Sequence, residues 1–228
     1  VAMVAEPTHH QKMVLVDYEK PEIAVGFVMG HNTLDAYWDN DRHSHERHHA
    51  QFGRNGATPR QDISSRVTGP VLEFLNHNFC EAWHKETHVD LLTPRQPIAA
   101  QLHVRPGHGV PVMAQVLRTQ SQEGKRDIEQ LYLKSVNNMT QFIYIENQYF
   151  RWPPLAEKIK SVVQNLLDGG RDLETDGPLY LFVVTNSSQE AMGDGSVNTF
   201  RMLKQLGRPQ LMPEGGQGRA ARRPARRA

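Results

Sequence analysis

One short apolar run near the start of the sequence constrains the fold more than any other feature. It follows a His-Gln-Lys triplet and ends at an aspartate, so that His10, Lys12 and Asp17 form the pattern H-x-K-x-x-x-x-D. The run from Lys12 to Tyr18 is rich in Val and Leu, which predicts a β-strand. Because side chains alternate along a strand, we expect His10 and Lys12 to project from the same face.

An imidazole beside an ammonium group suits a tetrahedral phosphate. The imidazole of His10 can attack phosphorus or transfer a proton, and Lys12 supplies positive charge to the phosphoryl oxygens. Asp17, at the end of the strand, is expected to order this site. The alternative is an ordinary solvent-facing pair on a strand, so the functional interpretation depends on the surrounding sequence.

Short β-rich runs alternate with helical patterns along most of the chain. Besides the first strand, we expect strands at 24–30, 63–67, 110–119, 142–150 and 179–185, helices after Gly69-Pro70 and at 126–140 and 155–167, and loops at 39–60 and 87–109. The first helix has apolar residues at three- and four-residue spacing, which predicts a buried stripe: Val71, Leu72, Leu75, Phe79 and Trp83. The alternation as a whole predicts an α/β layered architecture.

Charge and cysteine content exclude several classes of protein. The net charge of +1 depends on five arginines in residues 215–228; without them 21 basic residues face 25 acidic ones, which gives −4. The body of the chain therefore lacks the charge of a general nucleic-acid binder, and we expect no nucleic-acid partner. The single cysteine, Cys80, excludes an internal disulfide and fits a small core residue. No apolar run of 18 residues occurs, so no membrane span is predicted.

A histidine cluster at His43, His45, His48 and His49 could offer imidazoles to zinc. No cysteine lies nearby, and the carboxylates Asp41 and Glu46 are poorly spaced for ligation. A solvated polar loop is therefore the preferred interpretation. We predict no metal and no other cofactor.

The order of motifs around His10 resembles the eukaryote-like branch of the phospholipase D superfamily. Beyond the motif, the resemblance is carried by residues 26–39, 61–83 and 115–119, and by the Ile-Tyr-Ile-Glu-Asn-Gln-Tyr-Phe segment at 143–150. Residues 29–35 look most like lipase effectors of bacterial type VI secretion. The resemblance covers about residues 8–212 and implies a layered α/β sandwich of the phospholipase D type.

The family builds one site from two such motifs, one in each of two similar lobes, whereas this sequence holds one. We therefore expect an internal fragment. Residues 1–125 are predicted to form an N-terminally truncated first lobe, and residues 126–212 the start of a second lobe without its motif. Residues 213–228 are predicted to be a disordered Arg/Gly/Ala-rich tail, either a frameshifted end or a basic arm.

The resemblance also implies roles for individual residues. His10 would form a phosphohistidine, Lys12 would stabilise charge on the phosphoryl oxygens and Glu146 would orient a catalytic histidine. The remaining residues implied to fix geometry or lie beside the substrate are Asp17, Asn32, Asn147 and Gln148. From the residues alone, His31-Asn32 could equally form a turn, and Glu146 and Gln148 could be a buried polar pair.

The activity implied is hydrolysis of a membrane glycerophospholipid to phosphatidic acid and a head-group alcohol. The resemblance of residues 29–35 to secretion effectors implies export without a visible signal peptide, from the producer's cytoplasm to the periplasm of a target cell. It also implies an immunity protein and a component of the secretion machine as partners. Three alternatives remain: a superfamily nuclease that completes its site by dimerisation, a phosphatidyl-transferring synthase, and an inactive lipid-binding pseudoenzyme.

Overall fold

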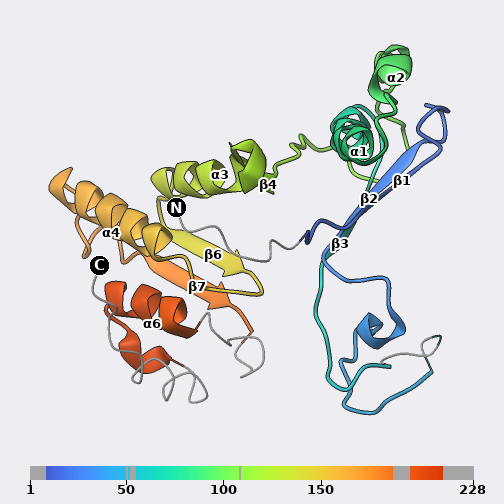
Figure 1. Ribbon diagram of the computed structural model, residues 1–228. Helices are drawn as coiled ribbons and strands as arrows, with labels where there is room; N and C mark the ends of the chain where they lie inside the picture. The colour runs from blue at the N-terminus through green and yellow to red at the C-terminus, as the bar shows by residue number, and fades with distance from the viewer. Residues whose placement is uncertain (1–8, 50, 52–54, 108, 187–195, 213–228) are drawn as a thin grey trace. The chain divides into compact units, whose positions relative to one another are not determined.

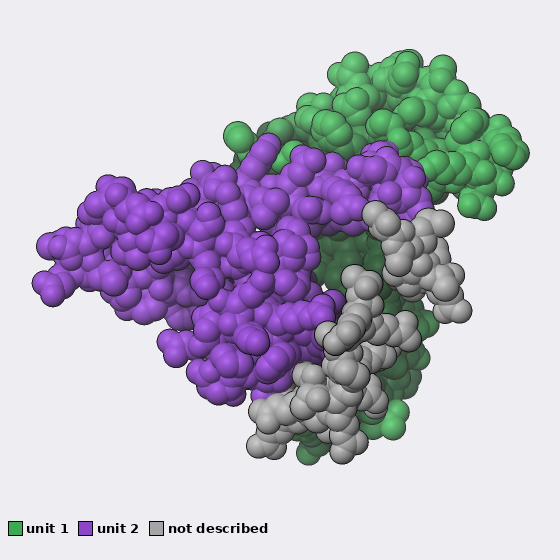
Figure 2. Space-filling view, turned by 60° about the vertical axis from the view of Figure 1, so that its left-hand side comes forward, with its two compact units in different colours: residues 1–116 green, residues 117–228 purple. Residues whose placement is uncertain are grey.

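The computed structural model describes residues 9–49, 51, 55–107, 109–186 and 196–212 (Figure 1). The chain divides into two compact units, Val1–Val116 and Leu117–Ala228, which Figure 2 colours separately. Both units contain helices and a sheet, so the predicted α/β class is confirmed. The assignment of two phospholipase lobes with a boundary at residue 125 stays a prediction, and the predicted tail at 213–228 lies outside the described residues.

Unit 1 is built on a three-stranded antiparallel sheet. Its strands β1 (Met13–Val16), β2 (Val25–Met29) and β3 (Ser64–Val67) lie in the order β1-β2-β3. All three were predicted, and each is shorter than its apolar pattern. The connection between β2 and β3 contains a turn of 3-10 helix, η1 (Asp35–Tyr37), just before the long polar loop expected at 39–60.

The helix α1 (Leu72–Thr87) packs against this sheet. It follows Gly69, whose φ of +84° favours glycine. An added Cβ at Gly26 of β2 would lie 2.7 Å from a Leu75 methyl and 2.8 Å from a Leu72 methyl, so the absence of a side chain lets helix and sheet approach closely. The buried core of unit 1 consists of Tyr18, Ala24, Leu72, Leu75 and Leu102.

The predicted buried stripe of α1 is partly wrong. Phe79 and Trp83 are 36% and 42% exposed, while Asn76 and Asn78 are buried. These asparagines are buried because each has a hydrogen-bond partner outside the helix, a property that apolar periodicity does not detect. The prediction for Cys80 is confirmed: the residue is 2% exposed, and burial raises the pKa of its thiol.

The predicted loop at 87–109 is also wrong in part, because it contains the helix α2 (Leu92–Ala99). The carboxylate of Asp90 accepts hydrogen bonds from the main-chain N–H groups of Leu92 (2.8 Å) and Thr93 (3.1 Å), which caps the start of the helix. Pro94 lies in the first turn, where a main-chain N–H would have no helical partner. Proline content alone therefore gave the wrong assignment.

Unit 2 begins with a short hairpin, β4 (Thr119–Gln120) and β5 (Lys125–Arg126), around the 3-10 turn η2 (Ser121–Glu123). The predicted strand at 110–119 is wrong for all but its last residue. Val110 and Met113 are 83% and 102% exposed, and no described segment pairs with them. An apolar run becomes a strand only where a partner satisfies its main-chain hydrogen bonds.

The rest of unit 2 is a parallel β-α-β arrangement with added helices. The strands β6 (Phe142–Glu146) and β7 (Tyr180–Val184) pair in parallel, and the helix α4 (Pro153–Asp168) connects them. The predictions of α4, β7 and α3 (Asp127–Asn137) are confirmed. The strand predicted at 142–150 is confirmed only over 142–146. The helix α6 (Ser196–Gln205) and the turn η4 (Pro209–Leu211) had no counterpart among the predicted elements.

The core of unit 2 joins these helices to one face of the two strands. Its buried members are Val136, Met139, Phe150, Leu155, Ala156, Ile159, Val162 and Met202, with Ile143, Ile145, Leu181 and Val183 of the strands packed against them. The opposite strand face is exposed and aromatic. None of the helices in the described part of the chain is long and apolar enough to cross a bilayer.

Candidate functional site

The motif strand is fixed to α1 through its alternate side chains. The Asn78 side-chain amide donates to the Gln11 amide oxygen at 2.9 Å and lies 3.3 Å from the Met13 sulfur. Met13 and Leu15 pack against the unit 1 core. Gln11, Met13 and Leu15 therefore face α1, and alternation places Lys12 on the outward face with the exposed Val14 and Val16.

His10 and Lys12 are in contact at the start of β1. The Lys12 ammonium donates to the main-chain carbonyl of His10 at 3.1 Å. The Met29 N–H donates to the Lys12 carbonyl at 2.9 Å, so the main-chain ladder of the sheet already includes Lys12. The His10 side chain is exposed and that of Lys12 partly so, which leaves both open to a ligand. Their phosphate-directed roles stay a prediction.

Asp17 lies at the far end of β1 from His10. It lies five residues after Lys12 along extended chain, a span of about 16 Å. Asp17 instead begins a turn: its φ is +50°, its carbonyl accepts from the Lys20 N–H at 2.8 Å, and its carboxylate lies 3.8 Å from the Lys20 ammonium. The structure thus places Asp17 where it orders the end of the strand and the turn before the buried Tyr18.

Asn32 is partly exposed and lies three residues after β2. Its neighbour His31 makes a contact that sequence reasoning missed: His31 Nδ1 lies 2.6 Å from Ser64 Oγ. Ser64 is opposite Met29 in the sheet, and Met29 bonds to Lys12. The His31–Ser64 pair therefore belongs to the same row across the sheet as Lys12. The 33-residue separation of His31 and Ser64 hid this pairing from any local pattern.

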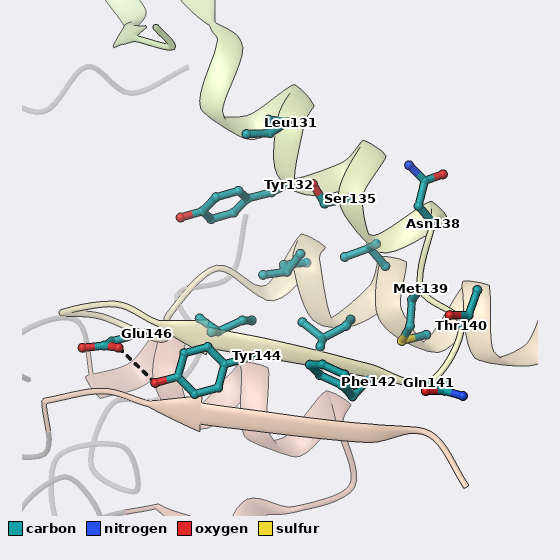
Figure 3. Close-up of a pocket in the computed structure, with 14 residues that line it drawn as sticks. Leu131, Tyr132, Ser135, Asn138, Met139, Thr140, Gln141, Phe142, Tyr144 and Glu146 are labelled. Carbon is teal, nitrogen blue, oxygen red and sulfur yellow. Dashed lines mark hydrogen bonds between the residues drawn. The ribbon is translucent and has the colours of Figure 1, made fainter. Parts of the chain in front are cut away.

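Glu146 ends β6 in unit 2 and is exposed, so the alternative of a buried polar pair with Gln148 is wrong. The Tyr144 hydroxyl donates to the Glu146 carboxylate at 2.9 Å, and this hydrogen bond raises the pKa of Tyr144 above its usual value. Both side chains line a pocket of about 470 Å³ between α3 and β6, to which Tyr132 also contributes (Figure 3).

Asn147 and Gln148 are held by contacts within their own segment. The Asn147 side chain donates to the Tyr149 carbonyl at 2.9 Å, and the Asn147 main-chain N–H donates to the Val184 carbonyl at 3.0 Å. The Gln148 side chain donates to the Tyr149 hydroxyl at 3.2 Å. Because Arg151 stacks over the Tyr149 ring at 3.7 Å, the segment after β6 has a defined conformation.

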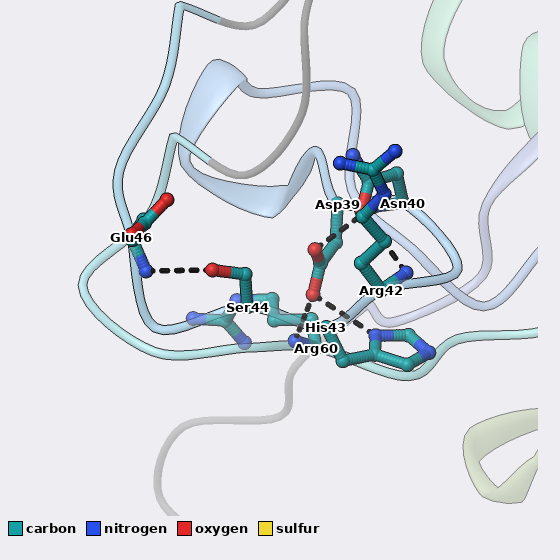
Figure 4. Close-up of polar contacts among 7 residues, drawn as sticks. All are labelled: Asp39, Asn40, Arg42, His43, Ser44, Glu46 and Arg60. Atoms are coloured by element: carbon teal, nitrogen blue, oxygen red, sulfur yellow. Dashed lines mark hydrogen bonds and ion pairs between the residues drawn. The ribbon is translucent and has the colours of Figure 1, made fainter.

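The histidine cluster forms an exposed loop, as the sequence predicted. Among the residues that the structure describes, no group of three or more His, Cys, Asp or Glu side chains is placed to hold a metal ion. The His43 imidazole donates to a carboxylate oxygen of Asp39 at 3.1 Å (Figure 4). His48 lies 3.7 Å from Glu46.

The comparisons with known proteins bear on these two units. No family model matches the chain. The chain is 29% identical over 206 residues to phospholipase D alpha 1 of Oryza sativa subsp. japonica, covering 68% of this chain and 25% of that protein. It is 28% identical over 194 residues to phospholipase D alpha 1 of Zea mays and 29% identical over 199 residues to that of Arabidopsis thaliana, each time covering 63% of this chain and 24% of the relative.

The fold and the site therefore define an α/β protein with an exposed His-Lys pair at the start of an anchored strand. The chain is distantly related in sequence to the plant phospholipases D alpha, and it spans about a quarter of the length of these relatives.

Proposed function

We propose that this chain is part of a phospholipase D-type phosphodiesterase that hydrolyses membrane glycerophospholipids to phosphatidic acid and a head-group alcohol. The single observation that carries the proposal is the H-x-K-x-x-x-x-D motif, set within a sequence distantly related to plant phospholipases D alpha. Support comes from the exposed His10 side chain and from the partly exposed Lys12, whose ammonium reaches the His10 main-chain carbonyl, because a phosphate needs both groups accessible.

The proposed reaction is a double displacement at phosphorus. The imidazole of His10 attacks phosphorus as the bond to the head-group oxygen breaks, and a second histidine, outside this sequence, gives its proton to that oxygen. The second histidine then takes a proton from water, whose oxygen attacks the phosphohistidine and releases phosphatidic acid. Lys12 and Asn32 stabilise charge on the phosphoryl oxygens. Asn147 and Gln148 lie beside the substrate, and Glu146 orients the second histidine.

The chain as given holds one half of such a site, so we propose that it has little or no activity as a monomer. Two copies would have to bring their His10 residues together to complete a site. The two units differ in sheet topology, antiparallel in one and parallel in the other, which argues against a copy of one replacing the other. Purified monomer that hydrolyses lipid vesicles at the rate of a complete phospholipase would contradict this proposal.

We further propose that the parent protein is an antibacterial effector delivered by a contractile secretion machine. Export by such a machine needs no cleaved signal peptide, and a lipid-degrading enzyme retained by its producer would attack the producer's own membrane. A dedicated immunity protein would then cover the His10 site in the producing cell. The support for this proposal is the resemblance of residues 29–35, Met-Gly-His-Asn-Thr-Leu-Asp, to lipase effectors of type VI secretion.

The test is periplasmic expression of the full-length parent in a bacterium that lacks the immunity protein. The wild-type parent should be toxic and should raise phosphatidic acid, measured by lipid mass spectrometry, while His10→Ala should do neither. His9→Ala is the matched control, since His9 is also exposed but lies outside the motif. Equal toxicity of the wild type and His10→Ala would show that lipid hydrolysis is not the harmful act. Cleavage of DNA in place of lipid would favour the nuclease alternative.

A further inference from the structure

A second imidazole lies at the end of the unit 1 sheet where the motif strand begins. His31 follows β2 by two residues, and its Nδ1 lies 2.6 Å from the Oγ of Ser64, the first residue of β3. Because neighbouring strands in this sheet are antiparallel, the start of β1, the end of β2 and the start of β3 share one end of the sheet. His10, which precedes β1, and His31 therefore lie at the same end.

The register of the sheet shows which face His31 uses. An added Cβ at Gly26 would meet two leucine methyl groups of α1, so position 26 faces the helix. Alternation along β2 then places Met29 on the opposite, outward face. Residues opposite each other in an antiparallel pair project from the same face, and Ser64 lies opposite Met29. The Ser64 hydroxyl and the His31 imidazole that contacts it are therefore on the outward face.

Lys12 lies on this face as well. The Met29 N–H donates to the Lys12 carbonyl at 2.9 Å, which continues the β1–β2 register by one residue and puts Lys12 and Ser64 on either side of Met29. The strand spacing separates the Cα atoms of Lys12 and Ser64 by about 10 Å. The Lys12 ammonium reaches the His10 carbonyl, so it points toward the end of the sheet that holds His31.

The contact with Ser64 engages one nitrogen of the His31 ring and leaves the other for a ligand. A hydroxyl can donate to Nδ1 or accept from it. When Ser64 donates, the neutral imidazole carries its proton on Nε2, and this N–H can donate to an anionic oxygen. His31 is partly exposed and Ser64 is exposed, so a ligand can reach them.

We propose that His31 is a phosphate-binding residue of the His10 site, oriented by Ser64. The Ser64 hydroxyl donates to Nδ1, and Nε2–H donates to a non-bridging phosphoryl oxygen across the sheet from Lys12. The ligand is a phosphodiester, and the inference rests on the proposed function, because it assigns this oxygen to the diester that His10 attacks. Ser64 is a positioning residue, since it acts through the imidazole.

The first experiment measures the tautomer of His31 in the full chain. Ring nitrogen shifts of the protein with ¹⁵N-labelled histidine are recorded at about pH 8, where imidazoles are ordinarily neutral. His31 should carry its proton on Nε2 in the wild type and lose this preference in Ser64→Ala. His103 is a matched reference: its Nδ1 lies 3.0 Å from the Gln101 carbonyl, which can only accept, so its proton should stay on Nδ1 in both proteins.

The second experiment measures binding of dimethyl phosphate, a simple phosphodiester, and of inorganic phosphate in a parallel titration. Both anions should shift the His10 and His31 ring signals with one dissociation constant. His31→Ala removes a hydrogen bond to a charged group and should weaken binding of the diester about tenfold, measured at His10. His31→Gln offers an amide N–H in place of Nε2–H and should restore most of the affinity. His77→Ala, at an exposed histidine of α1, should change nothing.

The outcomes separate this inference from the proposed function. A His10 signal that responds to dimethyl phosphate while His31 stays unmoved, equal affinity of the wild type and His31→Ala, or a response of His31 to inorganic phosphate alone would overturn the role of His31 and leave the proposed function standing. An unchanged tautomer in Ser64→Ala would overturn the role of Ser64. No response at either histidine would count against phosphodiester binding at His10 itself, and this inference would fail with it. Circular dichroism checks that each variant is folded.

Discussion

Both units pack helices against strands, but the strands of the two units pair in different directions. Unit 1 forms an antiparallel sheet, whereas unit 2 forms a parallel pair across a long helical connection. In both, helices cover one strand face and the other is exposed. The exposed face of unit 1 carries Lys12 beside Val14 and Val16, while that of unit 2 carries Phe142, Tyr144, Tyr180, Phe182 and Val184.

This difference shows what each unit contributes. The strand of unit 1 is held in register by a polar contact, from Asn78 to Gln11, next to the residue proposed to attack phosphorus. The strand of unit 2 is held by apolar packing and ends at a carboxylate, Glu146. In unit 1 a polar contact anchors the strand beside the proposed nucleophile. In unit 2 the carboxylate of Glu146 is held by the end of β6 and by the Tyr144 hydroxyl.

The largest expected effect is on catalysis by the parent protein. His10→Ala removes the proposed nucleophile and should lower the rate of lipid hydrolysis on the order of 10³-fold. Glu146→Gln keeps the size of the proposed orienting group and removes its charge. The rate of lipid hydrolysis should therefore fall clearly less in this variant than in His10→Ala. Steady-state hydrolysis of mixed vesicles measures both. A His10→Ala parent within tenfold of the wild type would refute the assignment of the site.

The next effect tests whether the two cores are independent. Leu72 of unit 1 is 0% exposed and Leu155 of unit 2 is 5% exposed, and their clusters share no member. Either leucine changed to alanine should destabilise its own unit by about 2–5 kcal/mol. Hydrogen exchange should then show reduced protection in β1–β3 for Leu72→Ala and in β6 and β7 for Leu155→Ala. Uniform loss of protection in both variants would mean that the units unfold as one.

How far the sequence predicts this fold depends on what kind of information each element needs. β2, β6, β7 and α4 follow from alternation or helical spacing because each has one buried face. The strand expected at 110–119 fails because pairing is a property of two segments, and the pattern of one segment does not contain it. The helix α2 was missed because the decisive feature is the cap at Asp90, not the composition of the segment.

The same distinction applies to the site. The motif located His10 and Lys12 directly, since both lie within three residues of sequence, just before β1. Sequence spacing could not show that Asp17 serves the turn or that His31 meets Ser64, because both facts depend on the length and register of folded strands.

Removing the hydrogen bond between Asn78 and Gln11, which fixes the motif strand to α1, should have a moderate effect on stability. Asn78→Ala leaves the partly buried Gln11 amide oxygen without its donor and should cost about 1–2 kcal/mol in the free energy of unfolding. A double-mutant cycle with Gln11→Ala isolates the contact, with an expected coupling of about 1 kcal/mol. Strictly additive effects in denaturant unfolding would show that the two side chains do not stabilise each other.

Asp39 gives unit 1 a sensitivity to strong acid. Burial alone would raise the pKa of Asp39, but hydrogen bonds from Arg60, His43 and Asn40 together hold that pKa below its usual value. A lowered pKa means that the stabilisation is present above the unfolded value, about pH 4, and is lost as the pH falls through the folded one. The protection of the Arg60 amide against hydrogen exchange, relative to its intrinsic rate at each pH, should fall below about pH 4 in the wild type. Asp39→Asn should show the reduced protection already near neutral pH.

The smallest expected effect lies in unit 2 and has the opposite sign. The hydrogen bond to Glu146 raises the pKa of Tyr144, so the neutral phenol is favoured in the folded state. This stabilisation is present below the unfolded pKa, about 10, and is lost as the pH rises through the folded value. Because both side chains are exposed, the free energy of unfolding should change little.

The effect of Glu146 should therefore be visible in the titration of Tyr144 itself. Monitoring the Tyr144 ring carbons by NMR during an alkaline titration should give a lower pKa in Glu146→Gln than in the wild type, because the substitution removes the negative charge beside the phenol. Tyr180 is a matched reference, because it is a similarly exposed tyrosine on the neighbouring strand, and the hydroxyl that donates to Glu146 is that of Tyr144. An unchanged Tyr144 titration would mean that the hydrogen bond does not persist in solution, and that the end of β6 does not hold Glu146 in the fixed position an orienting carboxylate requires.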